Sequence, residues 1–454
     1  DDNRRFTARH TAYYARRAAG GCGIVVTEGA SVHPSDWPYE RAPLAALCAD
    51  GWAAIAGACH DHGALVLASL DHAGGQGSSA YSQRELWAPS RVPEVNSREV
   101  PKWMEADDIA AVVRGFAEAA RLAVQAGCDG VELNAGQHSL VRQFLSGLTN
   151  HRDDEWGADR LLFARQVIGA VRAAVGDAPV ALRLSCDELA PWAGITPDMA
   201  PGIAAALVAE GVDLLTVVRG SIFSVEKTRP DFHEPGGFNM ALCSSVRQAV
   251  PGTPVFLQGS VDAEYAAWAI DEHHADGAEI TRGQIADPDL ARKVAQGQLE
   301  QIRPCIRCNQ TCQVRDARNP IVTCVAEPSS GHEADDPDWA NRSARPREVL
   351  VVGGGVAGLE TARVAAARGH SVRIVERGDR LGGVAALVPH AEPLVHWLVG
   401  QCHELGVSWV LGEEGLDAVT AATPGTVVVQ ATGGRQGTRA YDIADGALVV
   451  DAVE

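Results

Sequence analysis

Four cysteines, Cys305, Cys308, Cys312 and Cys324, lie within twenty residues of one another. The first three have C-x2-C-x3-C spacing, which lets three thiolates converge on one face of a cuboidal iron–sulfur cluster while the more distant fourth completes the coordination. Structural zinc sites usually pair two C-x2-C knuckles, and this segment has one. The spacing therefore predicts a 4Fe–4S cluster, with a zinc site and free thiols as the alternatives.

A glycine-rich turn further along the chain contains Gly353, Gly355 and Gly358. It follows a β-rich run at 348–352 and precedes a helical run, which is the context in which G-x-G-x-x-G binds the pyrophosphate of a dinucleotide. Glu376 ends the next apolar run, about twenty residues on, where a carboxylate binds the ribose hydroxyls. The pattern predicts a dinucleotide site, and a purely structural turn is the alternative.

Charged residues and glycines also follow several β-rich runs in the first 300 residues. Arg183 ends one run, where a buried cation could stabilise the anionic edge of a reduced flavin; an ion pair that closes a barrel is the alternative. Gly259 ends a later run, and Arg282 with Gly283 ends the next. A cation and backbone N–H groups there suit a phosphate, so these residues are predicted to bind FMN.

A repeated strand–helix unit must position these residues. Apolar runs predict seven buried parallel strands, at 24–28, 64–70, 130–134, 179–184, 214–218, 254–257 and 278–281. Amphipathic helices are predicted between them at 107–126, 159–175, 197–210 and 262–273. Such alternation gives either a doubly wound sheet or a (β/α)8 barrel. Polar residues and glycines at the end of every run favour the TIM barrel.

Seven strands are one fewer than a closed barrel needs, and the chain begins without methionine and enters a helical run at 7–19. We therefore expect the first barrel strand to be missing. Residues 1–300 are assigned to the barrel and 301–330 to the cluster segment. Residues 331–346 are polar and proline-punctuated, as in a linker. Residues 347–454 are assigned to a partial Rossmann-type domain that binds FAD or NAD(P).

Composition excludes several classes of function. The net charge of −19 argues against a surface for nucleic acid or an anionic membrane. No apolar run approaches the roughly 18 residues that span a bilayer, and no signal peptide is visible. The other seven cysteines, predicted to be buried free thiols, are Cys22, Cys48, Cys59, Cys128, Cys186, Cys243 and Cys402. Free thiols predict a reducing, cytoplasmic location; the sequence leaves open whether the chain forms a homo-oligomer.

Several segments together resemble the Old Yellow Enzyme superfamily, and more narrowly its iron–sulfur flavoproteins, the 2,4-dienoyl-CoA reductase and trimethylamine dehydrogenase group. The segments are Tyr14–Gly21, Phe144–Leu145, Asn150–Gly157, Ala286–Pro288 and Arg303–Gln310. The resemblance implies FMN in the barrel mouth, the cluster beside it and FAD in the following domain. It implies electron transfer between NAD(P)H, FAD, cluster, FMN and substrate. Gly382, Gly383 and Gly433 lie where flavin reductases place further FAD contacts.

The resemblance fails at two motifs. Ser69 replaces a glutamine that the family places against the flavin. Where the family shows His-x-x-His/Asn and then Gly-Tyr, this chain has the candidate catalytic residues Asn134, Gln137, His138 and Ser139, so the tyrosine proton donor is missing. Serine is a poor general acid, which leaves His138, and His233 in a later loop, as candidate donors. The changed motif also resembles the family branch associated with mycofactocin.

The leading hypothesis is an FMN-dependent oxidoreductase that exchanges a hydride with an activated alkene or an enoyl thioester. One alternative is an amine or alcohol dehydrogenase that passes electrons out through the cluster, and another is an electron-transfer module without substrate chemistry of its own. In the family a second dinucleotide-binding domain follows the segment at 431–433. No second glycine-rich turn appears before Glu454, so we expect that this chain alone does not turn over with NAD(P)H.

Overall fold

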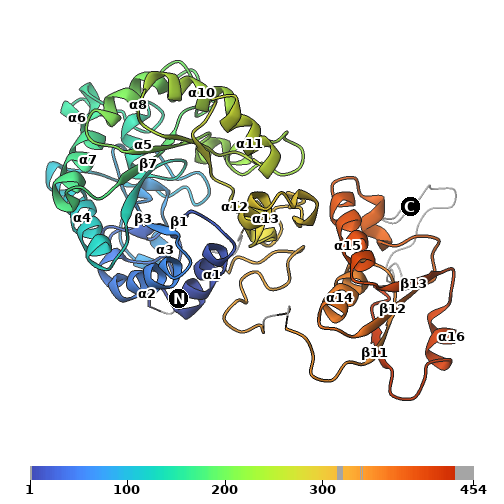
Figure 1. Cartoon of the computed structure of the whole chain (residues 1–454). Coiled ribbons are helices and arrows are strands. Elements are labelled where there is room, and N and C mark those ends of the chain that lie inside the picture. Colours follow the sequence, from blue (N-terminus) through green and yellow to red (C-terminus); the bar gives the residue numbers. More distant parts are fainter. Residues whose placement is uncertain (1–2, 314–320, 338, 340, 435–454) are drawn as a thin grey trace, which may run out of the picture. The chain divides into compact units, whose positions relative to one another are not determined.

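The computed structural model describes residues 3–313, 321–337, 339 and 341–434 (Figure 1). Contacts divide the chain into two compact units. The first unit contains residues 1–302 and 307–335, and the second contains 303–306 and 336–454. The predicted cluster segment is therefore divided, with most of its residues in the first unit.

The first unit is built on a curled parallel sheet with the strand order β1-β3-β6-β7-β8-β9-β10, in which β2 also pairs with β3. The bounds are β1 Ile24–Val26, β2 Ala30–Ser31, β3 Leu65–Asp71, β6 Gly130–Ala135, β7 Val180–Ser185, β8 Leu214–Val218, β9 Val255–Leu257 and β10 Gly277–Ala278. Strands that follow one another in chain order are the arrangement of a TIM barrel. The seven predicted strands are thus confirmed, although β10 is shorter than predicted because a helix begins at Thr281.

Helices connect successive strands and cover the outer side of the sheet (Figure 1). The longer ones are α1 Ala8–Ala19, α2 Ala49–His60, α4 Ala106–Gln125, α7 Leu162–Val175, α8 Ala200–Val208, α10 Met240–Ala249 and α11 Ala263–Asp271. Shorter ones are α3 Ser79–Ser82, α5 Leu140–Leu145, α6 Glu155–Ala158, α9 Val225–Thr228, α12 Thr281–Ala286 and α13 Leu290–Ala295. A separate pair of short strands joins β4 (Trp87–Ala88) to β5 (Lys102–Trp103). The predicted helix at 262–273 begins one residue late because Asp262 is its N-cap, with a side chain that accepts the Tyr265 amide.

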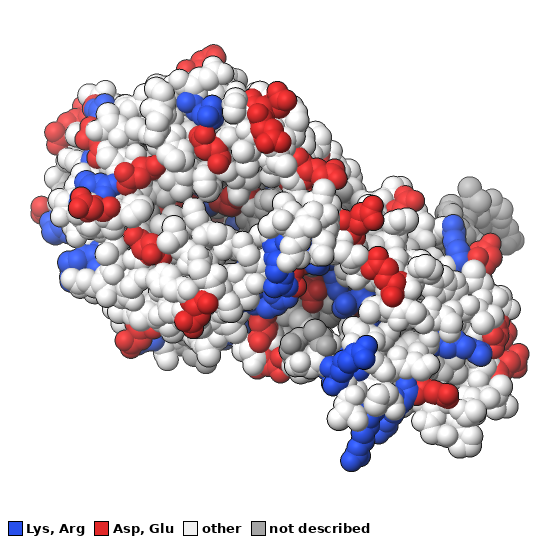
Figure 2. All heavy atoms as spheres, in the orientation of Figure 1, with Lys and Arg blue, Asp and Glu red and all other residues white. Residues whose placement is uncertain are grey.

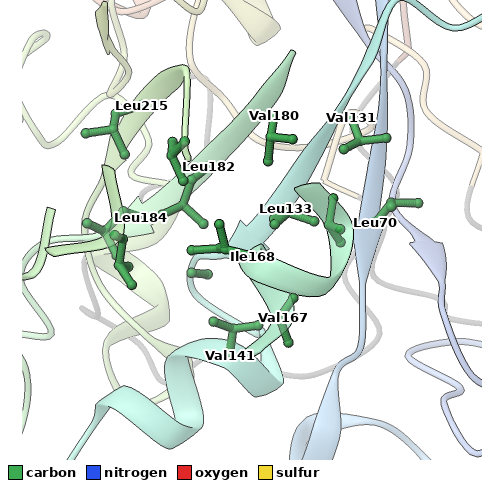
Figure 3. Close-up of a cluster of buried hydrophobic side chains, with 14 of the residues drawn as sticks. Leu70, Val131, Leu133, Val141, Val167, Ile168, Val180, Leu182, Leu184 and Leu215 are labelled. Atoms are coloured by element: carbon green, nitrogen blue, oxygen red, sulfur yellow. The ribbon is translucent and has the colours of Figure 1, made fainter. Parts of the chain in front are cut away.

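Alternate side chains of each strand point to opposite faces of the sheet. Leu70, Leu133 and Leu182 point to the outer face, where they pack with helical residues such as Val167 and Ile168 in the apolar core (Figure 3). The residues that alternate with these leucines along β3, β6 and β7 point into the barrel, and most of them are polar. The same strands therefore bury a hydrophobic core on one side and present polar chemistry on the other.

The second unit is a smaller parallel sheet with the order β13-β12-β11-β14. The strands are β11 Glu348–Val352, β12 Ser371–Glu376, β13 Ser408–Leu411 and β14 Val427–Gln430, and the helices are α14 Val356–Ala367, α15 Glu392–Glu404 and α16 Gly415–Thr420. A strand, a glycine turn and a helix open it, as in a Rossmann-type fold. Residues 435–454 of the predicted domain lie outside the described residues.

Acidic side chains are spread over the face of the molecule that Figure 2 shows, in keeping with the net charge of −19. In the part of the chain that the structure describes, no helix combines the length and the apolar character needed to cross a bilayer.

Candidate cofactor and substrate site

The inner face of the barrel carries a buried network of charged side chains around Arg183. The Arg183 Nε lies 3.1 Å from Glu132 Oε1 on the neighbouring strand, and its Nη1 lies 3.3 Å from Glu279 Oε1, just past β10. Ser69 Oγ donates to Glu132 over 3.4 Å. The Arg183 side chain is 19% exposed and therefore only partly buried, whereas the Glu132 side chain is 3% exposed.

The electrostatics of this network follow from its burial. Burial raises the pKa of Glu132, and Arg183 opposes that effect. Burial alone would lower the pKa of the Arg183 guanidinium, but Glu132 and Glu279 more than offset it and raise that pKa. Arg183 is therefore a permanent cation held between two carboxylates. The ion pair considered as an alternative is present, and the proposed contact with the flavin edge stays a prediction.

Directly beyond this network, towards the carboxyl ends of the strands, Asp71 contacts Asn134. The Asn134 Nδ2 donates to Asp71 Oδ2 over 2.9 Å, and the His72 amide donates to Asp71 Oδ1 over 2.7 Å. Burial, with the nearby Asp36 carboxylate, raises the pKa of Asp71 to about 7, although hydrogen bonds from His72, Asn134 and Ser139 act against the rise. Sequence reasoning missed Asp71. It could have been identified as a carboxylate at a predicted strand end, two residues after Ser69 and therefore on the same face of the strand.

The other predicted catalytic residues have different surroundings. Ser139 is buried and is the N-cap of α5, where its Oγ accepts the Val141 amide over 3.0 Å. Burial lowers the pKa of His138 to about 4, with Arg229 and Arg142 contributing in the same direction, so its imidazole is neutral at pH 7.

Gln137 and His233 have partners other than Asp71 and Asn134. The Gln137 Nε2 donates to the Arg219 carbonyl over 3.3 Å. The His233 side chain is 75% exposed and pairs with Asp231. The structure thus joins Asn134 and Ser139 to Asp71, and it gives Gln137 and His233 separate partners.

The predicted phosphate-binding residues lie past β9 and β10. Gly259 has a φ of +126°, and a Cβ there would lie 2.9 Å from Asn239 Nδ2, so the strand end must stay bare. Arg282 donates to the Pro230 carbonyl over 2.6 Å, to Asn309 Oδ1 over 2.8 Å and to Ser260 Oγ. Gly283 lies inside α12, where a Cβ would meet Ile280. The end of β9 thus has no side chain at Gly259, and the Arg282 cation contacts the next residue, Ser260. This arrangement fits a phosphate group.

The cysteine segment is shared between the units, since Cys308, Cys312 and Cys324 belong to the first and Cys305 to the second. Among the residues that the structure describes, no three histidine, cysteine or carboxylate side chains are grouped to hold a single metal ion. The Cys324 sulfur accepts the Ala326 amide over 3.4 Å. The donor set fits an iron–sulfur cluster because it consists of thiols, one of which already receives the kind of N–H bond that tunes such clusters.

The residues around Cys308 are fixed to the first unit. Arg307 and Asn309 both have a φ of +52°, so the backbone turns sharply on either side of Cys308. Arg307 Nη1 donates to the Glu234 carbonyl over 2.8 Å, and Asn309 Nδ2 donates to the Arg229 carbonyl over 2.6 Å. The loop that presents Cys308 is therefore held by groups other than the thiol.

The glycine turn of the second unit has the geometry of a dinucleotide site. Gly353 has a φ of +107°, and a Cβ on Gly358 would lie 1.9 Å from the Gly353 carbonyl oxygen. Space beside Gly355, the N-cap of α14, is open. Only glycine allows the turn and the helix to approach so closely, and the arrangement fits a pyrophosphate at the start of α14.

The other predicted FAD residues surround this turn. The Glu376 carboxylate accepts the amides of Gly354 and Gly378, each over 2.7 Å. Gly382 and Gly383 have positive φ values, and Gly382 forms a bridge with Gly355. Gly433, with a φ of +72°, follows β14 with open space beside it. The structure brings Glu376, Gly382 and Gly383 to the turn; their contact with FAD stays a prediction.

Two family models match parts of this chain. Residues 1–301 match the NADH:flavin oxidoreductase / NADH oxidase family, and residues 323–452 match the pyridine nucleotide-disulphide oxidoreductase family. A metal reductase of Desulforamulus reducens is 34% identical over 97% of this chain and 68% of its own length. An N,N-dimethylglycine/sarcosine dehydrogenase of Chromohalobacter salexigens is 32% identical over 94% of this chain and 65% of its own length.

Two further similar proteins are named as reductases. A cinnamate reductase of Clostridium sporogenes is 30% identical over 94% of this chain and 70% of its own length. The structure of a 2-naphthoyl-CoA reductase with 2-naphthoyl-CoA has a TM-score of 0.90 and 28% identity, over 97% of this chain and 70% of that one. The chain thus spans about two thirds of the length of the relatives that it matches.

Proposed function

Because the chain belongs to the NADH:flavin oxidoreductase / NADH oxidase family, the FMN-dependent oxidoreductases of the Old Yellow Enzyme type, we propose that it exchanges a hydride with an activated alkene or an enoyl thioester. FMN would supply a two-electron carrier at the barrel mouth. The observation that carries the proposal is the Arg183 cation, held between Glu132 and Glu279 on the inner face of the barrel. A fixed cation at that place stabilises negative charge that develops on a reduced ring.

The chain's own residues have separate tasks in this proposal. Arg183 and Ser69 would bind the flavin edge, and Gly259, Arg282 and Gly283 would bind the FMN phosphate. Asn134 and Gln137 would orient the substrate at the mouth. The thiolates of Cys305, Cys308, Cys312 and Cys324 would hold the 4Fe–4S cluster, and the glycine turn at 353–358 would hold FAD, with NAD(P)H as the electron donor of the complete protein.

Cinnamate and naphthoyl-CoA are the compounds named for two relatives, and each has a double bond conjugated to an acyl group. Conjugation lets the acyl oxygen accept charge when a hydride adds to the far carbon, which suits a site with fixed hydrogen-bond donors. A second candidate function, oxidation of an N-methylated amine, is favoured by the similarity to N,N-dimethylglycine/sarcosine dehydrogenase.

A comparison of half-reactions distinguishes these functions. The complete protein, reconstituted with FMN, FAD and iron–sulfide, is reduced anaerobically and mixed with cinnamoyl thioesters, cinnamate or enones. We expect flavin reoxidation with formation of the saturated product. Reduction of the oxidised protein by dimethylglycine or sarcosine, with no reoxidation by any alkene, would establish the amine function instead. Reoxidation by dyes alone would indicate an electron-transfer module.

Removal of Arg282 is expected to weaken FMN binding. A charge-assisted contact is worth about 1.5–3 kcal/mol, so Arg282→Ala should raise the FMN dissociation constant by roughly ten- to a hundred-fold. Fluorescence titration of the FMN-free protein measures this. Arg282→Lys should recover part of the affinity because it keeps the cation. Arg247→Ala removes a cation that pairs with Asp276 before β10, and it should leave FMN affinity unchanged. Equal affinity in Arg282→Ala and the wild type would refute the phosphate assignment.

A further inference from the structure

We propose that Asp71 is the proton donor to the substrate of this barrel, and that Asn134 is the positioning residue that orients its carboxyl group. The inference rests on the proposed hydride exchange and replaces the missing tyrosine with a residue on a different strand. It follows from strand register, from the hydrogen bonds of the two side chains and from the charges around them.

Strand register places Asp71 and Asn134 on the inner face of the barrel. Ser69 of β3 is the register partner of Glu132 of β6, and the two side chains meet inside the barrel. Because side chains of a strand repeat every second residue, Asp71 and Asn134 lie on the same face as Ser69 and Glu132, one layer nearer the carboxyl ends. The residues between them, Leu70 and Leu133, point into the helical core (Figure 3). Substrates of TIM-barrel enzymes bind at this edge.

The hydrogen bonds fix the orientation of the carboxyl group. Gly136 N donates to Asn134 Oδ1 over 2.8 Å, so the amide must present its Nδ2 to Asp71. That Nδ2 binds Asp71 Oδ2 over 2.9 Å, and the His72 amide binds Oδ1. A carboxyl group has about four lone-pair positions, so sites for a proton remain. Asp71 is the last residue of β3 and is partly exposed there.

Burial and a neighbouring charge favour the protonated form of Asp71, so that part of the carboxyl population holds a proton near neutral pH. Asp36, in the loop after β2, is the carboxylate that acts on Asp71, and burial acts more strongly. The buried His72 and the partly buried His33 lie nearby, and desolvation lowers the pKa of each, so neither supplies a cation near pH 7. A pKa of about 7 for Asp71 is close to the value at which a general acid works best at neutral pH.

The proposed step balances in atoms and electrons. The hydride would come from reduced FMN, the reductant of the proposed function; a C–H bond would form at one alkene carbon as the C=C π bond breaks. The electron pair of that bond takes up the proton of Asp71 at the neighbouring carbon. The Asp71 O–H bond breaks, a second C–H bond forms, and the carboxylate regains its proton from water. The substrate is reduced by two electrons and the flavin is oxidised by two.

The test uses Asp71→Asn in the reconstituted complete protein. We expect reoxidation of the reduced flavin by the alkene to slow by about 10²–10⁴-fold, the usual contribution of a general acid. FMN content and flavin reduction by dithionite should be unchanged. In the wild type the alkene rate should fall as pH rises through about 7, because only the protonated carboxyl donates; in Asp71→Asn this pH dependence should disappear. Asp187→Asn is the matched control, since Asp187 is a buried carboxylate just past β7 that pairs with Arg219.

An infrared titration tests the protonation of Asp71 without turnover. The wild type should show the carbonyl band of a protonated carboxyl that is lost as pH rises through about 7, and Asp71→Asn should lack it. A normal alkene rate in Asp71→Asn would overturn the assignment and leave the proposed function standing. Failure of the wild type to reduce any alkene would overturn the function. If the wild type reduces no alkene and the titrating band is also absent, Asp71 is not a proton donor. If the band is present, the result supports Asp71 as a proton donor to another substrate.

Discussion

Arg183→Leu is expected to destabilise the barrel unit by about 3–5 kcal/mol, because removing the cation leaves the buried Glu132 carboxylate without a compensating charge. Arg183 is the cation that the structure places between Glu132 and Glu279, and the Glu132 side chain is 3% exposed. Denaturant unfolding of the protein without FMN measures the effect apart from any contribution of cofactor binding.

The loss should be larger at pH 8 than at pH 5. Burial raises the pKa of Glu132 in the folded protein above its ordinary value of 4.5, and Arg183 limits that rise. Without Arg183 the folded pKa rises further. A carboxyl with a raised folded pKa binds more protons when folded than when unfolded, so its contribution to stability is lost as pH increases from the unfolded pKa towards the folded one.

Two further variants complete this test. Arg183→Leu combined with Glu279→Gln should recover part of the lost stability, because the second change removes one of the unpaired charges. Arg121→Leu removes an arginine from an exposed pair with Glu118 and should have no measurable effect. Equal destabilisation of Arg183→Leu at both pH values would show that the carboxylates are not the cause.

The elements that depend on local pattern were predictable. The strand at 214–218 is confirmed to the residue, because a run this short, with β-branched residues and a glycine shortly before it, favours a strand over a helix. The glycine turn was predictable for a similar reason, since Gly353 has a φ that other residues rarely adopt. In both cases a few neighbouring residues determine the structure.

The site residues that depend on distant partners were not predictable. Glu279 follows a short strand and meets Arg183, which is far away in sequence, only because the sheet curls. Asp71 was visible as a residue, but its raised pKa depends on burial and on Asp36. Ser139 shows the converse case: the resemblance aligns it with a tyrosine of the family, and in the structure its hydroxyl caps a helix. A residue type alone does not distinguish these roles.

Cys308→Ser is expected to remove the 4Fe–4S cluster and leave the barrel folded. The wild-type complete protein should contain about four iron and four acid-labile sulfide, and the variant should lose most of both together with the broad visible absorption. The fold should survive because Arg307 and Asn309 hold the loop through Glu234 and Arg229, without the thiol. Cys22→Ser is the matched control, since Cys22 is a partly buried thiol far along the chain from the cluster segment.

The two outcomes of metal analysis distinguish the cluster from its rival. Zinc without iron in the wild type, or an iron content in Cys308→Ser equal to that of the wild type, would contradict the cluster assignment.

If iron is lost, reduction experiments test whether the cluster carries electrons to the barrel. Dithionite should still reduce FMN in the variant because it acts on the flavin directly. Reduction of FMN by NAD(P)H through FAD should slow greatly, since the cluster is the proposed route from one unit to the other, and an unchanged rate would mean that electrons take another path.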